Sequence, residues 1–304
     1  MKSGGPIPEG VAREVARALG SPEAPDQVEE ASALGGGCIH PAARIRTAFG
    51  TEAFLKWNRY PGPGGFGVEA RGLEALARRG GLRVPRVLAL QEGGPEIQGW
   101  LLLELIREGP AGGETDRLLG TGLARLHRPL PDEAPGWEED GILATLPQPN
   151  PAGLSWPDFW VEARLLPRWK EVHGAFGREA RELWERAAAD MDRILDGWQE
   201  DGLSLLHGDL WSGNLLTDSE GRPVLIDPAV YRGHREVDLA MMELFGGFSG
   251  AALATYREAW PLAPGYEDRR RDAYQLYPLL VHVELFGGGY VAGASARIRK
   301  LASC

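Results

Sequence analysis

Cysteine, lysine and long apolar runs are what this sequence has least of. The two cysteines, Cys38 and Cys304, cannot build a disulfide framework, and their separation matches no metal-binding motif. The apolar run Trp100–Leu103 ends at Glu104 and is far shorter than the roughly 20 residues that a membrane-spanning helix needs. The first residues lack the apolar segment of a secretory signal. We therefore expect a cytoplasmic protein with no membrane partner.

The charge balance excludes another class of partner. The chain of 304 residues carries 43 acidic and 33 basic side chains, which gives a formal net charge of −10. A nucleic-acid-binding surface needs clustered lysine and arginine, so we expect no nucleic-acid partner. A chain of this length exceeds what one compact core usually holds, and we expect it to form two lobes.

The most informative segment runs from His207 to Asp227. It places Asp209, Asn214 and Asp227 between short apolar runs. In phosphoryl transfer from a metal-bound nucleotide, one Asp orients and deprotonates the attacking hydroxyl, while an Asn and a second Asp hold the metal ions. The spacing therefore predicts Asp209 as the catalytic base, and Asn214 and Asp227 as ligands of Mg²⁺. The alternative is turn chemistry alone, with Asp227 as a plain strand end before Pro228.

A rare lysine points to the same chemistry. Lysine occurs only at four positions, which are Lys2, Lys56, Lys170 and Lys300. Lys56 lies in the strand-like segment 51–58, and a compact ammonium on a flexible stem suits contact with two phosphates. A helical pattern over 66–79, stopped by Gly80 and Gly81, places Glu69 where it can pair with Lys56, while Glu74 should face solvent. The alternatives are a half-exposed strand lysine and a solvated Glu69.

Two loops complete the expected nucleotide site. The run Gly35, Gly36, Gly37 and Cys38 lies between two possible strands, and backbone amides without a neighbouring Cβ can approach phosphate oxygens closely. Strands are expected over 84–90 and 100–106, followed by a break at 104–113. We interpret this break as the hinge between a nucleotide-binding lobe, 1–106, and a catalytic and substrate lobe, 107–304. Backbone groups of Glu104 and Ile106 are the expected contacts of the adenine edge.

The second lobe is expected to be mainly helical. Helical patterns cover 117–127, 157–172 and a long run over 178–199. The proline-rich loop 129–156 is expected to pack on its own tryptophans and to touch the substrate cleft.

The position of Cys38 suggests a redox role. The thiol lies in the glycine loop rather than in an apolar run, so it is expected to be accessible and reactive. The chain would then be a monomer or a homodimer linked through Cys38. The alternative is an inert small residue that fits the hairpin.

These segments resemble the fructosamine kinase, or ketosamine-3-kinase, family, which is part of the aminoglycoside-phosphotransferase-like branch of the protein-kinase-like fold. The resemblance runs from about residue 10 to residue 300, and the segments that carry it are 36–39, 54–56, 69–76, 207–214, 226–241, 244–248 and 276–287. Trp211-Ser212-Gly213 and Leu244–Phe248 narrow it from the wider branch to ketosamine kinases. Two positions depart from the family pattern: His234 stands where an acid is usual, and Glu284 where an amide is expected. These departures are expected to leave the phosphoryl-transfer residues intact and to bear on the preference of the substrate pocket.

The resemblance implies an α+β fold of two lobes, with a small antiparallel sheet and one helix in the first lobe and a larger, mainly helical second lobe. It implies ATP-dependent, Mg²⁺-assisted phosphorylation of the 3-hydroxyl of a small-molecule or protein-bound ketosamine, which leads to release of the free amine. Trp211 would be a platform under the sugar-amine and His282 a second substrate contact. The alternative for Trp211 is a core tryptophan between the lobes.

Two other functions fit much of the same pattern. One is a kinase of the same branch that acts on an aminoglycoside or an amino alcohol, although the sequence around Asp209 is not strongly acidic, as a polycationic substrate would favour. The other is a pseudokinase that binds nucleotide without transfer. A pseudokinase has usually lost the strand lysine, the base or a metal ligand, and none of these is missing here.

Overall fold

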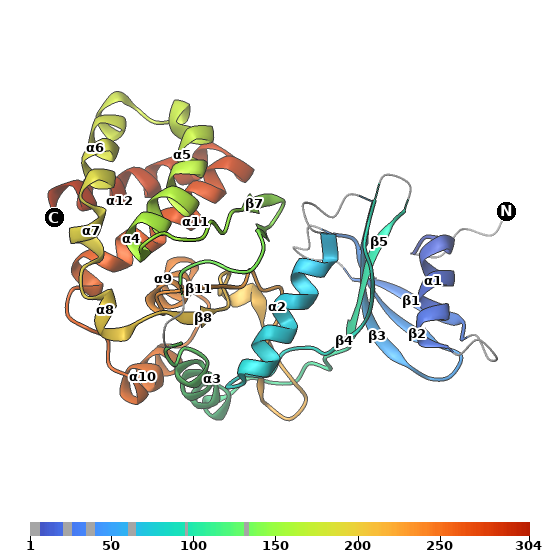
Figure 1. Cartoon of the computed structure of the whole chain (residues 1–304). Helices are drawn as coiled ribbons and strands as arrows, with labels where there is room; N and C mark the ends of the chain where they lie inside the picture. The colour runs from blue at the N-terminus through green and yellow to red at the C-terminus, as the bar shows by residue number, and fades with distance from the viewer. Residues whose placement is uncertain (1–6, 21–25, 35–39, 60–64, 95–96, 131–133) are drawn as a thin grey trace.

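The computed structural model describes residues 7–20, 26–34, 40–59, 65–94, 97–130 and 134–304. A sheet with two helices lies at one end of the molecule and a group of helices at the other (Figure 1). We call these the sheet lobe, Glu9–Glu104, and the helical lobe, Gly113–Ser303. The α+β class predicted from the sequence is confirmed. No helix among the described residues is long and apolar enough to cross a membrane.

The sheet lobe is built on five antiparallel strands in the order β1-β2-β3-β5-β4. Its elements are α1 (Glu9–Leu19), β1 (Val28–Leu34), β2 (Ala42–Thr47), β3 (Glu52–Asn58), α2 (Gly65–Arg79), β4 (Val87–Gln91) and β5 (Gly99–Glu104). Strand β4 starts later than predicted, because its pairing with β5 begins at Val87 and Val84 and Pro85 come before it. The fifth ends at Glu104 rather than at Ile106.

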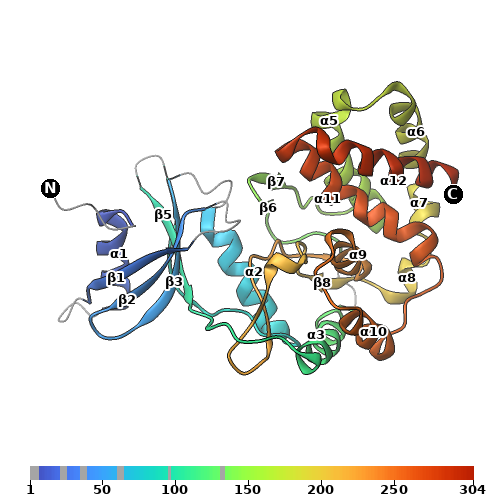
Figure 2. The same ribbon diagram turned by 180° about the vertical axis from the view of Figure 1, so that it is seen from behind.

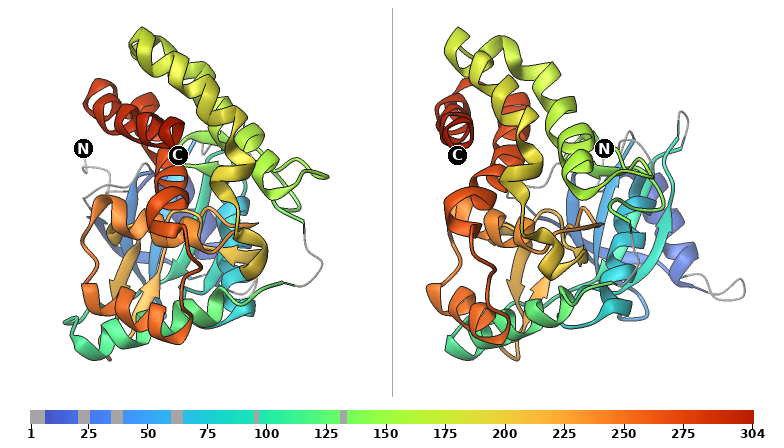
Figure 3. Two further views of the ribbon diagram at one scale, coloured as in Figure 1. Left: turned by 90° about the vertical axis from the view of Figure 1, so that its left-hand side faces the viewer. Right: turned by 60° about the vertical axis from the view of Figure 1, so that its left-hand side comes forward.

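The two faces of the sheet are covered by different helices, because successive side chains of a strand point to opposite faces. On one face, Leu55 and Leu102 pack with Val11 and Val15 of α1. On the other, Leu101 and Leu103 pack with residues of α2, which lies between the sheet and the helical lobe in Figures 1 and 3. Lys56 alternates with Leu55 along β3, so it points to the face that carries α2.

The helical lobe also contains the short strands that hold the motif residues. Its elements are α3 (Gly113–Leu126), β6 (Gly141–Leu143), β7 (Leu146–Gln148), α4 (Trp156–Phe159), α5 (Leu166–Val172), α6 (Arg178–Ala189), α7 (Met191–Leu195), α8 (Trp198–Asp201), β8 (Ser204–Leu206), β9 (Leu215–Thr217), β10 (Pro223–Leu225), β11 (Tyr231–Gly233), α9 (Glu236–Phe245), α10 (Gly250–Ala259), α11 (Arg271–Phe286) and α12 (Val291–Ser303). Figure 2 shows α11 and α12 packed with α5 and α6. Wide π-type turns join α4 to α5 and precede α11.

The long helix predicted over 178–199 is wrong, because the chain forms three shorter helices there. Helix α6 ends at Ala189 and α7 ends at Leu195. Asp196 is extended, with ψ 140°, and Gly197 is left-handed, with φ 97°. Such a backbone cannot continue the hydrogen bonds of one helix. The predicted helices at 66–79 and 117–127 are confirmed by α2 and α3, and Gly80 does have the left-handed conformation, with φ 72°.

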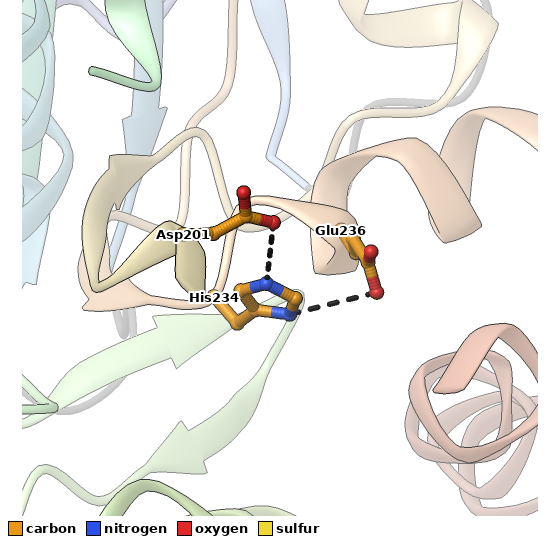
Figure 4. A group of neighbouring side chains, drawn as sticks. All are labelled: Asp201, His234 and Glu236. Carbon is orange, nitrogen blue, oxygen red and sulfur yellow. Dashed lines mark hydrogen bonds and ion pairs between the residues drawn. The ribbon is translucent and has the colours of Figure 1, made fainter. Parts of the chain in front are cut away.

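A buried charge cluster joins α8 to the segment before α9 (Figure 4). In Figure 4, His234 Nε2 lies 3.1 Å from an oxygen of Asp201, and its Nδ1 lies 3.6 Å from an oxygen of Glu236. The same Nδ1 lies 2.8 Å from the Tyr274 hydroxyl. Arg235 pairs with Asp201 at 2.8 Å, and Arg270 pairs with Glu236 at 2.6 Å. Asp201, His234 and Glu236 lie close enough to hold a metal ion. Their ligand atoms are already used by the two arginines and the tyrosine, so the cluster is a structural ion-pair network, and His234 belongs to it rather than to a substrate pocket.

We predict that Arg270→Met lowers the free energy of unfolding by about 3–5 kcal/mol, because it leaves Glu236 as an unpaired buried charge. Urea unfolding followed by circular dichroism measures this change. The combined change Arg270→Met and Glu236→Leu should recover part of the loss. Arg178→Met is the control, since Arg178 pairs with Glu182 at the surface, where the arginine is 87% exposed. The prediction would be contradicted if Arg270→Met and Arg178→Met changed the free energy of unfolding by the same small amount.

Candidate active site

The loop between β8 and β9 carries the predicted base. Asp209 follows β8, and a tight 3₁₀ turn, Ser212–Asn214, brings Asn214 back beside it. The Asn214 side chain donates through Nδ2 to Asp209 Oδ2 at 2.9 Å and to the Asp209 carbonyl at 2.8 Å. Ile226 N donates to the Asn214 carbonyl at 3.0 Å, which ties the loop to the segment that contains Asp227. The three motif residues are thus brought together by main-chain pairing of neighbouring loops.

Backbone amides fix the direction of this loop. Asp238, in the first turn of α9, accepts hydrogen bonds from His207 N at 2.7 Å and Gly208 N at 2.9 Å. Gly208 is left-handed, with φ 80°, and a Cβ placed on it would lie 2.0 Å from the Ala229 carbonyl oxygen. A side chain is therefore excluded at the residue directly before the base, because both the conformation and the space require glycine.

Two buried side chains hold Asp238 in turn. His127 Nε2 lies 3.1 Å from Asp238, and His127 Nδ1 lies 3.0 Å from the Tyr256 hydroxyl. Burial lowers the pKa of His127 and keeps the ring neutral, so one nitrogen donates to the carboxylate and the other accepts from the hydroxyl. This chain of hydrogen bonds connects α10 and α3 to the loop of the base. Sequence reasoning assigned no role to Asp238 or His127.

The second carboxylate faces the sheet lobe. Lys56 Nζ lies 2.9 Å from Glu69 and 2.5 Å from Asp227. Burial alone would lower the pKa of Lys56, but the two carboxylates raise it above its ordinary value, so the lysine stays charged. Asp227 has φ 53°, a left-handed conformation that is rare outside glycine, and is not the extended strand end that the alternative required. The predicted pair of Lys56 with Glu69 is present, and Glu74 is exposed as expected.

The predicted base, Asp209, has a raised pKa. Burial raises the pKa of Asp209 to about 7. The hydrogen bond from Asn214 opposes this rise, and the nearby charges of Asp227 and Asp238 add to it. A carboxylate with a pKa near neutrality is a better proton acceptor than an ordinary Asp, because catalytic groups work best near the operating pH. Asp209 is therefore suited to accept a proton from an alcohol.

These residues line one cavity of about 620 Å³. Lys56, Glu69, Asp209, Asn214 and Asp227 form its polar wall. Apolar and aromatic side chains form the rest, and they include Trp211, Phe245, His282, Phe286 and Tyr290. Trp211 is 38% exposed and lines this cavity, so the alternative of a core tryptophan between the lobes is wrong. Its ring lies over Gly213, where a Cβ would be only 2.2 Å away. Residues Ile142–Ala144 of the predicted cleft loop also line the cavity.

The other predicted nucleotide contacts are not among the described residues that line the cavity. Gly35, Gly36, Gly37 and Cys38 are outside the described residues. The Glu104 side chain pairs with Arg83 at 2.5 Å, and Arg83 also pairs with Asp218 on the β9–β10 turn at 2.5 Å. Glu104 and Ile106 are not among the described residues that line the cavity, so their contact with adenine stays a prediction.

Asn214 and Asp227 have the chemistry of a magnesium site. Carboxylate and amide oxygens are hard ligands of the kind that Mg²⁺ prefers. Asn214 uses its Nδ2 to hold Asp209, which leaves its amide oxygen as the atom that could bind a cation. Asp227 accepts from Lys56 through Oδ1, and its side chain is 34% exposed and lines the cavity, so Oδ2 is the atom that could bind a cation. The residues present thus fit the metal that the sequence predicts.

Comparison with known proteins agrees with this geometry. The family model described as fructosamine kinase matches residues 11–303. A protein of Synechocystis named Probable ketoamine kinase is 35% identical over 95% of each chain. The chloroplastic protein-ribulosamine 3-kinase of Oryza sativa subsp. indica is 36% identical over 88% of this chain and 77% of its own.

Comparison with solved structures identifies the fold. A crystal structure from Thermobifida fusca, described as that of a "putative fructosamine-3-kinase", aligns with a TM-score of 0.80 at 33% identity, over 91% of this chain and 95% of that one. The aminoglycoside phosphotransferase APH(4)-Ia, at 17% identity, aligns with a TM-score of 0.59 over 91% of this chain and 95% of its own. At that identity the likeness shows the fold alone. The predicted protein-kinase-like architecture is confirmed.

We predict that Gly208→Ala lowers kcat by about 100-fold or more, because a displacement near 1 Å of a catalytic group has an effect of this size. Steady-state turnover, with thermal unfolding in parallel, measures it. Gly50→Ala is a matched control: Gly50 also has φ 80°, but nothing lies within 4 Å of the position that a Cβ would take there. Both changes introduce similar backbone strain, so only Gly208→Ala should lose turnover. A kcat within a few-fold of the parent would contradict the role of Gly208.

Proposed function

The chain belongs to the fructosamine kinase family, and we propose from this premise that its cavity transfers the γ-phosphoryl group of ATP to the 3-hydroxyl of a ketosamine. The enzyme is a phosphotransferase with an alcohol as acceptor. The observation that carries the proposal is the meeting of Asp209, Asn214, Asp227 and Lys56 in one cavity. Phosphorylation at C3 would destabilise the sugar adduct and lead to release of the amine.

Asp209 would act on the acceptor. Its carboxylate orients the 3-hydroxyl and takes the proton as the hydroxyl oxygen forms a bond to the γ-phosphorus. The bond between that phosphorus and the bridging oxygen of the β-phosphate breaks, so the products are ADP and the ketosamine 3-phosphate. Asn214 holds Asp209 at 2.9 Å and keeps the accepting oxygen in place.

The other charged residues would act on the donor. Lys56, which pairs with Glu69 at 2.9 Å, would contact the α- and β-phosphates. Asn214 and Asp227 would hold Mg²⁺. When bound, the metal neutralises charge on the β- and γ-phosphates. In the described structure Asp227 pairs with Lys56, and both line the same cavity, so phosphates bound there would meet both side chains.

Other predictions from the sequence stay proposals. They are the lobe boundary at 106, the hinge over 104–113, the phosphate-binding glycine loop, the cytoplasmic location and a dimer linked through Cys38. We also propose Trp211 and His282 as substrate contacts, since both line the cavity that contains Asp209.

The experiment that tests the function is product analysis. The purified chain is incubated with ATP and Mg²⁺ and with a ribulosamine, a fructosamine, an aminoglycoside or choline, and ADP formation is followed. ³¹P and ¹H NMR then locate the new phosphate. We predict turnover of a ketosamine with the phosphate on C3, and loss of about 10²–10⁴ in kcat for Asp209→Asn with ATP binding retained. Turnover of the aminoglycoside or choline alone would contradict the substrate, and ATP binding without any turnover would indicate a pseudokinase.

A further inference from the structure

An ion pair outside the cavity joins α2 to the helical lobe. Arg71 donates through Nη2 to one carboxylate oxygen of Glu139 at 2.7 Å and through Nε to the other, so the pair is bidentate. The hydrogen bond to Glu139 raises the pKa of Arg71 above its ordinary value. Neither side chain is among the described residues that line the cavity. What the pair does therefore depends on the two segments that it joins.

On the side of the sheet lobe, Arg71 lies on the helix that carries the partner of the buried lysine. Glu69, two residues earlier, pairs with Lys56 at 2.9 Å. The next residue, Gly72, packs on the helical lobe, since a Cβ placed on it would lie 3.1 Å from Val230 Cγ2. Backbone hydrogen bonds tie the residues of one helical turn together, so Arg71 moves with Glu69 and hence with Lys56.

On the side of the helical lobe, Glu139 precedes the β6–β7 hairpin, which reaches toward the sheet lobe in Figures 1 and 2. Asn150 closes the base of this hairpin: its Nδ2 donates to the Glu139 carbonyl at 2.8 Å and its N donates to Asp140 at 2.8 Å. At the tip, Ala144 has φ 60°, which suits the first position of a mirror-image two-residue turn. Residues 142–144 line the cavity, so Glu139 is fastened to a hairpin whose tip lies at the catalytic site.

We propose that Arg71 and Glu139 are positioning residues, which clamp the β6–β7 hairpin to α2 and so fix the hairpin tip at the cavity relative to Lys56. Exposed ion pairs usually contribute little, but a bidentate pair of arginine with a carboxylate is the kind that does contribute. The two side chains are 47% and 34% exposed, so salt screens this clamp far more than the buried pair of Lys56 with Glu69. The position of the hairpin should therefore depend on ionic strength.

Hydrogen exchange of the hairpin amides measures the clamp independently of turnover. We expect Arg71→Met and Glu139→Gln each to speed exchange of the paired amides in residues 141–148 by about two- to fivefold, the range that an ion pair of this kind supports. The double variant should exchange no faster than the single variants, because all three lose the same pair. Salt at about 0.5 M should speed exchange in the parent protein but not in the variants.

A second arginine of α2 provides the matched control. Arg78 pairs at 3.8 Å with Glu74 of its own helix. Arg78→Met therefore removes the same charge from α2 and leaves the pair of Arg71 with Glu139 intact. Its exchange in residues 141–148 should stay at the parental rate.

The expected effect on turnover rests on the proposed function. With a ribulosamine as acceptor, Arg71→Met and Glu139→Gln should each lower kcat/KM by about two- to fivefold at about 50 mM salt, and the double variant should be no worse. At about 0.5 M salt the difference from the parent should vanish, because the parental clamp is then screened. The KM for ATP should stay unchanged, since Lys56 keeps both of its carboxylate partners. A purely structural defect would persist at both salt concentrations.

The outcomes separate the two claims. The clamp would be overturned if Arg71→Met changed exchange and kcat/KM no more than Arg78→Met does, if the losses were the same at both salt concentrations, or if faster exchange left kcat/KM unchanged. Absence of phosphorylation of any ketosamine by the parent protein would overturn the proposed function, whereas the exchange rates would still decide whether the pair holds the hairpin.

Discussion

The ion pairs of Lys56 are the interaction on which the arrangement of the two lobes depends. The lysine side chain is 5% exposed, and a buried ammonium is tolerated only when it is paired. One partner, Glu69, comes from the helix that covers the sheet, and the other, Asp227, comes from the loop that follows β10. The lysine can satisfy both only if β3, α2 and that loop keep their relative positions. The same requirement places Lys56, the predicted phosphate contact, beside the predicted metal ligand Asp227.

The helical lobe supplies the second constraint, through the main chain. Asp238 holds the amides of His207 and Gly208, and Tyr256 and His127 hold Asp238. His127, His207, Asp238 and Tyr256 are buried and are not among the described residues that line the cavity. A fixed backbone aims Asp209 into the cavity, and the burial that accompanies it raises the pKa of that carboxyl. The position of Asp209 and its raised pKa thus have one structural cause.

Much of the site could be predicted because its residues are close in sequence. Asp209, Asn214 and Asp227 lie within one loop and hairpin, and Lys56 and Glu69 lie on consecutive elements. The periodicity of α2 was enough to separate Glu69 from Glu74. Asp238 and His127 could not be assigned this way, since their contacts join segments that are more than 30 and 100 residues apart. An acid in the first turn of the helix after the motif was the one available sign of Asp238.

Other features depend on packing that sequence patterns do not contain. The helical pattern of 178–199 gives no sign of the breaks, but the backbone departs from helical geometry first at Asp190, with ψ 11°, and again at the left-handed Gly197. The departure at His234 suggested a change in substrate preference, whereas the residue is buried in an ion-pair network with Asp201. Trp211 and His282 were predicted as substrate contacts from the family resemblance. Phe245, Phe286 and Tyr290 line the same cavity but come from α9, α11 and the turn after it, so no single segment predicts that they meet.

The most direct test of the account is a double-mutant cycle across the cleft, with kcat/KM for a ribulosamine measured for the parent, Lys56→Met, Asp227→Asn and the double variant. If the two side chains act as one unit in phosphoryl transfer, the double variant should be only about as impaired as the more damaged single variant, because groups that act together are strongly non-additive. Strictly additive losses in ΔΔG‡, with all four proteins folded, would contradict the account.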